Sequence, residues 1–400
     1  MSTPKSTTHR GRGLLLYPIV AALGVALIGT PSASAASTTA TTGSLAGSQT
    51  AIVDSPPSVT GEPLQTIERA GSMRRGSSSD PASWSRKRLA SKLVLAGVTS
   101  TNLTSARSWV RGGIGGIVLF GTPPTNLEKQ LKALKRKSPD GHLLIASDEE
   151  GGSVQRLSRL IGRMPSAKTI GATKTPRQTK RLAFTYGKRM KVLGVNNDLA
   201  PVADLAYRGS YTDRDRRAFS ANPRRNGRYV TAFATGLQKA GVLATVKHWP
   251  GGGAVANTHT QAGRTPPWRS VQHRDLVPFR AAFAGGVGSV MVSHARVPGL
   301  TGRLPASQSK AAMKALRADA GDAVVIMTDS LAMAAVTKSM GQSQQEAAVR
   351  AIAAGSDLAL IQGDTKKMVR ALQKAIKRGK ISRDAAVASA RRIVAAQSRF

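Results

Sequence analysis

Short apolar segments alternate with longer segments of helical periodicity from about Trp84 to the C-terminus. Each apolar segment is four to six residues long, which suits a buried strand. Regular alternation of strand and helix is typical of an α/β fold with a parallel sheet and right-handed crossovers. The predicted strands are Leu93–Gly97, Gly116–Phe120, Leu143–Ser147, Asn197–Val202, Leu243–Lys247, Ser289–Ser293, Val324–Thr328 and Leu358–Ile361.

Eight predicted strands favour a closed (β/α)8 TIM-type barrel over an open doubly wound sheet. The segments between and after them include the helices that would cover this barrel. These predicted helices are Leu127–Lys137, Pro176–Leu193, Arg224–Ala240, Leu276–Gly285, Gln308–Ala318, Gln344–Ala354, Lys366–Arg378 and Arg383–Ser398.

Polar residues recur at or just after the ends of the predicted strands. Strand ends meet on one face of a barrel, where the βα loops build active sites. The pattern therefore indicates an enzyme, with these side chains at its centre: Asp148, Asp204, His248, His294, Asp329 and Gln362.

The N-terminal 80 residues lack the barrel pattern. Residues 1–35 resemble an export signal, with basic residues, the apolar run Leu14–Ile28 and the small-residue site Ala33-Ser34-Ala35. A retained membrane anchor is the alternative, although the run is short for a bilayer span. Residues 36–80 are rich in Ser, Thr, Ala, Gly and Pro and predict a flexible linker, so the barrel domain is expected over 81–400.

Composition narrows the class of protein. The chain is 40% hydrophobic and 20% charged, as in globular proteins, and it has no cysteine, which excludes a disulfide framework. The net charge of +38 favours anionic partners. Scattered cations and few aromatics argue against nucleic acid, so anionic cell-wall polymers are the expected partner; a purely compositional origin of the charge is the alternative.

Three segments could carry chemistry. In Thr328-Asp329-Ser330-Leu331 a strand delivers a carboxylate that could be a nucleophile, a metal ligand or a helix N-cap. The segment from Lys247-His248 through Trp249-Pro250-Gly251-Gly252-Gly253 forms a glycine-rich loop that leads to Asn257 and His259, and it lacks a phosphate-binding motif. His259 could act over the barrel mouth or be an ordinary solvated loop residue.

The third segment runs from Asp148 through Glu149-Glu150-Gly151-Gly152 to Arg156. Its acids suit hydroxyl recognition on a sugar, and no further oxygen ligands at metal-site spacing accompany them. A charged loop, Arg214–Asn222, contains Arg217-Ala218-Phe219-Ser220.

In their order along the chain, these segments resemble the barrel domain of glycoside hydrolase family 3, together with Leu199-Ala200-Pro201-Val202-Ala203-Asp204 and the stretch Ala347–Asp357. The resemblance is to its single-domain β-N-acetylhexosaminidase branch and covers about Trp84 to the C-terminus.

The resemblance implies retaining hydrolysis of a terminal β-linked N-acetylglucosamine unit, with Asp329 as the nucleophile. It implies sugar binding by Asp148, Arg156, Arg217, Lys247 and His248. The acid/base would be His259, supported from two residues earlier by Asn257.

Two positions depart from the family pattern. Gly252 stands where the family usually has His, and Asn257 stands where it has Asp, so the imidazolium loses a charged partner. We expect a secreted, monomeric glycosidase without metal or cofactor, acting on cell-wall or chitin-type glycans. The alternatives are another sugar specificity within the family and a weakened barrel that binds glycans without cleaving them.

Overall fold

The computed structural model describes residues 80–252 and 262–400, which all belong to one compact unit, Met73–Phe400. The predicted signal at 1–35, nearly all of the linker at 36–80, Asn257 and His259 lie outside the described residues. Among the described helices, none is long and apolar enough to cross a bilayer.

Eight parallel strands form the sheet, in the order β10-β1-β2-β3-β6-β7-β8-β9. A parallel bridge between Met327 and Leu358 joins the two end strands, so the sheet is a barrel, as the sequence predicts. The strands are β1 (Val94–Thr99), β2 (Gly116–Phe120), β3 (Leu144–Ser147), β6 (Asn197–Asp198), β7 (Leu243–Trp249), β8 (Ser289–Val292), β9 (Val325–Thr328) and β10 (Ala359–Ile361).

The fourth barrel strand is shorter than the predicted segment Asn197–Val202. Its ladder covers only Asn197–Asp198, and Val202 returns to the sheet through a single bridge to Lys247. Pro201 lies between these points and has no backbone N–H to donate to a ladder. A small hairpin that the pattern did not predict, β4 (Glu149–Gly151) with β5 (Val154–Gln155), follows β3.

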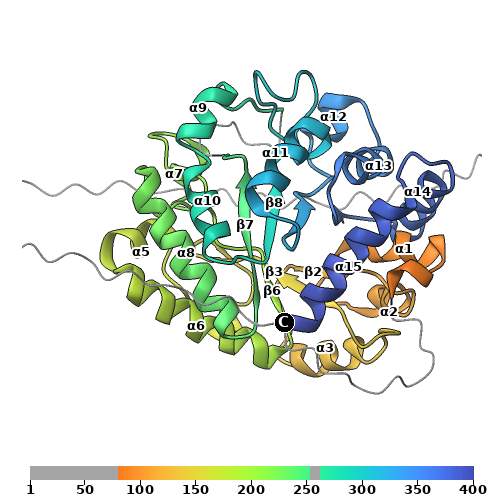
Figure 1. Ribbon diagram of the computed structural model, residues 1–400. Coiled ribbons are helices and arrows are strands. Elements are labelled where there is room, and N and C mark those ends of the chain that lie inside the picture. Colours follow the sequence, from red (N-terminus) through yellow and green to blue (C-terminus); the bar gives the residue numbers. More distant parts are fainter. Residues whose placement is uncertain (1–79, 253–261) are drawn as a thin grey trace, which may run out of the picture. The chain divides into compact units, whose positions relative to one another are not determined.

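Helices surround the barrel, with α6 and α8 on one side and α14 and α15 on the other (Figure 1). Capping residues define both ends of α6. Thr175 and Gln178 form a capping box before its first turn, and Gly194 ends the helix with its backbone in the left-handed region. The α-helices are α1 (Arg86–Lys92), α2 (Thr104–Arg111), α3 (Leu127–Lys135), α4 (Ser158–Ile161), α5 (Ala167–Thr173), α6 (Pro176–Leu193), α7 (Tyr211–Arg214), α8 (Pro223–Lys239), α9 (Trp268–His273), α10 (Val277–Ala284), α11 (Lys310–Ala320), α12 (Thr337–Met340), α13 (Gln344–Ala354), α14 (Thr365–Lys377) and α15 (Arg383–Arg399), with short 3-10 turns at Pro81–Ser83 and Ala306–Gln308.

Asp357 ties the closing strands to the outer helices. It is fully buried, and its Oδ2 accepts hydrogen bonds from the backbone N–H of Ile326 and from Arg317 of α11, each at 2.9 Å. Its Oδ1 accepts from Ser389 at 2.7 Å and Arg392 at 3.0 Å, both on α15. A buried carboxylate with four donors holds β9, α11 and α15 together where the barrel closes.

We expect Asp357→Asn to lower the free energy of unfolding by about 3 kcal/mol, because it leaves two guanidinium groups beside a neutral amide. Urea denaturation measures this loss. The matched control is Asp319→Asn, which breaks a surface pair with Arg280 at 3.0 Å and should cost less than about 1 kcal/mol. Equal losses in both variants would contradict the closing role of Asp357.

Candidate active site

The carboxyl ends of neighbouring strands bring the polar side chains together. Asp148 directly follows β3, Asp329 directly follows β9, and His294 lies two residues beyond β8. Lys247 and His248 lie within the last residues of β7, where the register against β8 shifts between Lys247 and Trp249. Such irregularities redirect side chains at the rims of barrels.

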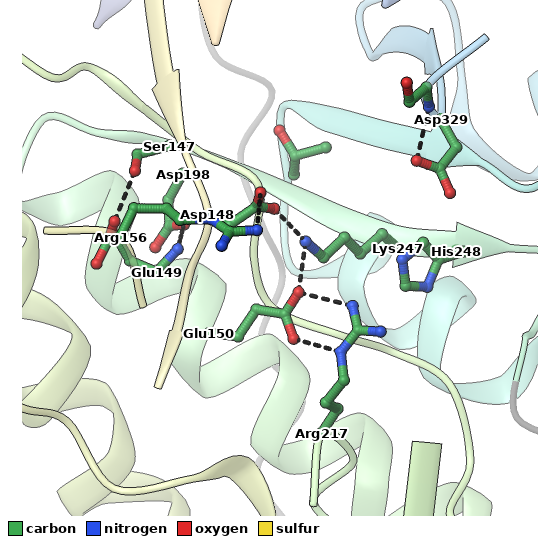
Figure 2. Close-up of polar contacts among 12 residues, drawn as sticks. Ser147, Asp148, Glu149, Glu150, Arg156, Asp198, Arg217, Lys247, His248 and Asp329 are labelled. Carbon is green, nitrogen blue, oxygen red and sulfur yellow. Dashed lines mark hydrogen bonds and ion pairs between the residues drawn. The ribbon is translucent and has the colours of Figure 1, made fainter. Parts of the chain in front are cut away.

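Lys247 forms the centre of a buried ion-pair cluster. Its Nζ lies 2.7 Å from Asp148 Oδ1 and 2.6 Å from Glu150 Oε1. Arg217 donates two hydrogen bonds of 2.8 Å to Glu150, one to each carboxylate oxygen. Figure 2 shows Lys247 directed at both carboxylates, with Asp329 set apart from them on the side of His248.

The cluster stays charged because its members compensate one another. Burial opposes ionisation of Glu150, but Arg217 and Lys247 outweigh it and hold its pKa well below the ordinary value. Burial also opposes the charge of Lys247, and the carboxylates of Asp148 and Glu150 raise its pKa despite it. Glu150 is therefore ionised at neutral pH and cannot serve as a proton donor there.

Asp148 faces two cations with its two oxygens. Its Oδ2 lies 3.8 Å from Arg156, a long contact compared with the 2.7 Å contact of Oδ1 with Lys247. Its side chain is 15% exposed and that of Arg156 is 40% exposed. This part of the cluster has hydrogen-bonding capacity left for hydroxyl groups of a ligand.

His248 is oriented by Asp204. Its Nδ1 lies 2.7 Å from Asp204 Oδ2, and its backbone N–H donates to Oδ1 at 3.1 Å. The backbone N–H of Gly252 donates to the same Oδ1 at 2.5 Å. Burial opposes ionisation of Asp204, but His248 and these donors keep its pKa below the ordinary value. Asp204 therefore fixes the orientation of the imidazole ring of His248.

Asp329 sits on a turn. Its backbone N–H donates to the carbonyl of Val292 at 2.9 Å, and its Oδ1 accepts from the N–H of Ser330 at 2.7 Å. The residues after it form turns, and the next helix, α12, begins at Thr337. Asp329 is therefore not the N-cap of a following helix, which removes that alternative.

His294 forms a hydrogen bond to the turn that carries Asp329. It is 1% exposed, its Nε2 lies 3.0 Å from the Ser330 carbonyl, and its Nδ1 lies 2.8 Å from Ser307 Oγ. Since a carbonyl only accepts, Nε2 carries the proton and Ser307 donates to Nδ1. Burial lowers the pKa of His294, so the ring is neutral.

Two further acids, Glu149 and Asp198, lie beside the cluster. Both accept hydrogen bonds, but neither forms an ion pair with a cation of the described residues. Glu149 accepts from Ser147 Oγ at 2.6 Å and from the Leu157 N–H at 3.1 Å, and its own N–H donates to Asp198 at 3.0 Å. Burial raises the pKa of Glu149 to about 8 and raises that of Asp198 well above its ordinary value. Glu149 therefore carries a proton at neutral pH, and burial favours the protonated form of Asp198.

The structure thus brings together six of the residues assigned from sequence, namely Asp148, Arg156, Arg217, Lys247, His248 and Asp329. Asn257 and His259 lie outside the described residues. The sequence pattern grouped Glu150 with the acids that suit hydroxyl recognition, but it did not single out Glu150 as a partner of Lys247 and Arg217. It noted Asp204 and His294 only as strand-end residues, since their partners come from other strands.

Comparison with known proteins agrees with the fold. The sequence model of the glycosyl hydrolase family 3 N-terminal domain matches residues 92–396. The chain belongs to glycosyl hydrolase family 3.

Relatives within the family carry hexosaminidase names. The chain is 41% identical over 226 residues to beta-hexosaminidase LpqI of Mycobacterium tuberculosis, a match that covers 54% of this chain and 58% of that relative. It therefore spans less than two thirds of that relative's length. A family 3 hydrolase structure from Mycobacterium smegmatis is similar with a TM-score of 0.74 at 33% identity, over 80% of this chain and 98% of that one. A β-N-acetylglucosaminidase from Paenibacillus gives a TM-score of 0.74 at 31% identity, over 78% and 62%.

The buried protonated acid predicts a pH dependence of stability. The pKa of Glu149 is about 8 in the folded protein against 4.5 in the unfolded chain, so the folded state holds the extra proton between these values. The extra proton on Glu149 stabilises the folded state. This stabilisation is complete below about pH 4.5 and is lost as the pH rises through 8. We expect Glu149→Gln to be increasingly more stable than the wild type from pH 5 to 8, by up to about 1.4 kcal/mol per pH unit.

Denaturation across this pH range measures the difference between the two proteins. Glu150→Gln is the matched control, because the pKa of Glu150 is lowered and its loss should destabilise the protein to the same degree across that range. A difference between Glu149→Gln and the wild type that does not change with pH would show that Glu149 is ionised in the folded protein.

Proposed function

We propose that this family 3 barrel is a retaining β-N-acetylhexosaminidase that removes terminal β-linked N-acetylglucosamine from cell-wall or chitin-type glycans. The observation that carries the proposal is that Asp329, Asp148 and Lys247 lie at the carboxyl ends of barrel strands, with Glu150 and Arg217 joined to Lys247 in one ion-pair cluster. The hexosaminidase names of relatives at 41% and 32% identity support the reaction class.

Each part of the cluster has a role in this mechanism. Asp329 would attack the anomeric carbon and form the covalent glycosyl–enzyme intermediate. Asp148 and Lys247 would bind sugar hydroxyls, with Arg156 and His248 beside them. Arg217 and Glu150 would hold Lys247 in place, since Glu150 joins the two cations.

The proton donor requires a group other than Glu150, which is ionised, and the resemblance to the family assigns the role to His259 with Asn257 as its support. Water would then hydrolyse the intermediate with the same His as base. The resemblance of residues 1–35 to an export signal supports a location outside the cytoplasm, and one relative at 34% identity is named a secreted glycosyl hydrolase.

The proposal is tested with nitrophenyl N-acetyl-β-glucosaminide and nitrophenyl β-glucoside. We expect turnover of the first and little of the second. Turnover of the glucoside alone would show another specificity, and binding of N-acetylglucosamine oligomers without hydrolysis of either would show a binding protein.

Asp329→Asn should lower kcat on the N-acetylglucosaminide by at least about a thousandfold, equivalent to about 4 kcal/mol of barrier, because it removes the nucleophile. The melting temperature should be nearly unchanged, since the side chain lies on a strand-end turn. Asp322→Asn, an exposed carboxylate before β9, is the control and should keep full activity. A folded Asp329→Asn with normal turnover would exclude Asp329 as the nucleophile.

His259→Ala should damage hydrolysis of a natural-type disaccharide far more than that of the nitrophenyl substrate, whose leaving group departs with little help. Asn257→Asp should restore a charged partner, raise the pKa of the His and move the alkaline limb of the rate profile upward. Steady-state kinetics on both substrates against pH measures these effects. Equal losses on both substrates with an unmoved profile would remove His259 from the mechanism.

A further inference from the structure

A groove lies on the outer wall of the barrel between α1, α2 and α14, on the side where Figure 1 shows these helices together. Its volume of about 470 Å³ falls within the range of small-molecule sites. Trp109, Ile114 and Val369 supply apolar lining, and three cations stand beside them: Lys87, Lys366 and Arg370.

The charge of the groove is uncompensated. No acidic side chain lines it, and within the described ranges none of its three cations forms an ion pair. Elsewhere on the surface, cations such as Lys132 and Lys168 are paired with carboxylates at 2.5 and 2.9 Å. The nearest acid on α14, Asp364, caps the helix at Lys367 N and faces the Lys367 side chain at 3.9 Å. The groove therefore favours an anion.

Trp109 adds an aromatic surface to the groove, which a ligand would have to match. It is partly buried against the core while lining the groove, so part of its indole is available to a ligand. An indole presents a flat apolar face that suits the apolar face of a sugar ring. A ligand that satisfies both features combines ring faces with negative charges at intervals along a chain.

Two other hollows lack this combination. The hollow between α13 and α14 has an acidic residue, Glu346, in its lining beside the cations. The hollow along α6, α8 and α10 has cations but no aromatic side chain in its lining.

We propose that the groove between α1, α2 and α14 binds an acidic polysaccharide, with a sugar ring on Trp109 and its carboxylate or phosphate groups at Lys87, Lys366 and Arg370. The first turn of α14 follows β10, so the groove begins at the end of the barrel that carries Asp329. A bound polymer would hold the protein against an anionic matrix while the barrel mouth stays open. This surface is separate from the catalytic cluster and does not depend on the proposed hydrolysis.

The test compares binding of hexagalacturonate with that of neutral maltohexaose by calorimetry, using the full chain. The variant with Lys87→Gln, Lys366→Gln and Arg370→Gln should bind hexagalacturonate at least about tenfold more weakly, through loss of charge-assisted contacts. Trp109→Leu should weaken it as well while leaving the binding of inorganic polyphosphate unchanged.

The matched control removes three exposed cations from other helices, with Arg177→Gln, Arg181→Gln and Lys314→Gln. It should bind hexagalacturonate as the wild type does, and both triple variants should keep the wild-type rate on the nitrophenyl substrate and the wild-type melting temperature. Equal weakening in the two triple variants would show that binding follows net charge and would overturn the proposal. Binding of maltohexaose as tight as that of hexagalacturonate would overturn it too.

Discussion

Closure of the sheet between β9 and β10 is the constraint on which the site depends. Within the described residues, the two segments form one bridge pair, Met327 with Leu358, and a further backbone hydrogen bond from Leu331 to Leu360, which is a short pairing. Asp357 reinforces it by accepting from the Ile326 N–H and from arginines of α11 and α15. Because the barrel is closed there, the turn that carries Asp329 faces the tips of β3 and β7 across the same rim.

The carboxylates at that rim fall into two classes, those with a cation as partner and those without one. Asp148 and Glu150 share Lys247, and Arg217 completes the balance, so these acids are ionised and held in place. Glu149 and Asp198 lie close by without an ion-pair partner of their own, and burial raises the pKa of both, which keeps Glu149 protonated at neutral pH. The same kind of side chain is thus charged or neutral according to whether a cation reaches it, which limits the negative charge around Lys247.

The sequence predicted the barrel and much of its rim, because both follow from local patterns. Apolar runs such as Gly116–Phe120 are strands in the structure with the same bounds, and the polar residues after them lie at the strand ends. The short ladder of β6 and the hairpin β4–β5 escaped prediction, since they depend on Pro201 and on paired glycines in tertiary contact. The ion pairs of Glu150 could not be predicted either, because Arg217 and Lys247 lie far from Glu150 in the sequence.

The departure at Gly252 can be judged from the contacts at its backbone. A Cβ placed there would lie 3.0 Å from Asp204 Oδ2, so a larger side chain requires the carboxylate to move by a few tenths of an ångström. The Gly252 N–H meanwhile donates to Asp204 Oδ1, a contact that any residue other than proline could make. The loop is therefore anchored to Asp204 through its backbone. The resemblance implies a histidine of the family at this position. With glycine here, the backbone contact to Asp204 still holds the end of β7, and Asp204 still orients His248.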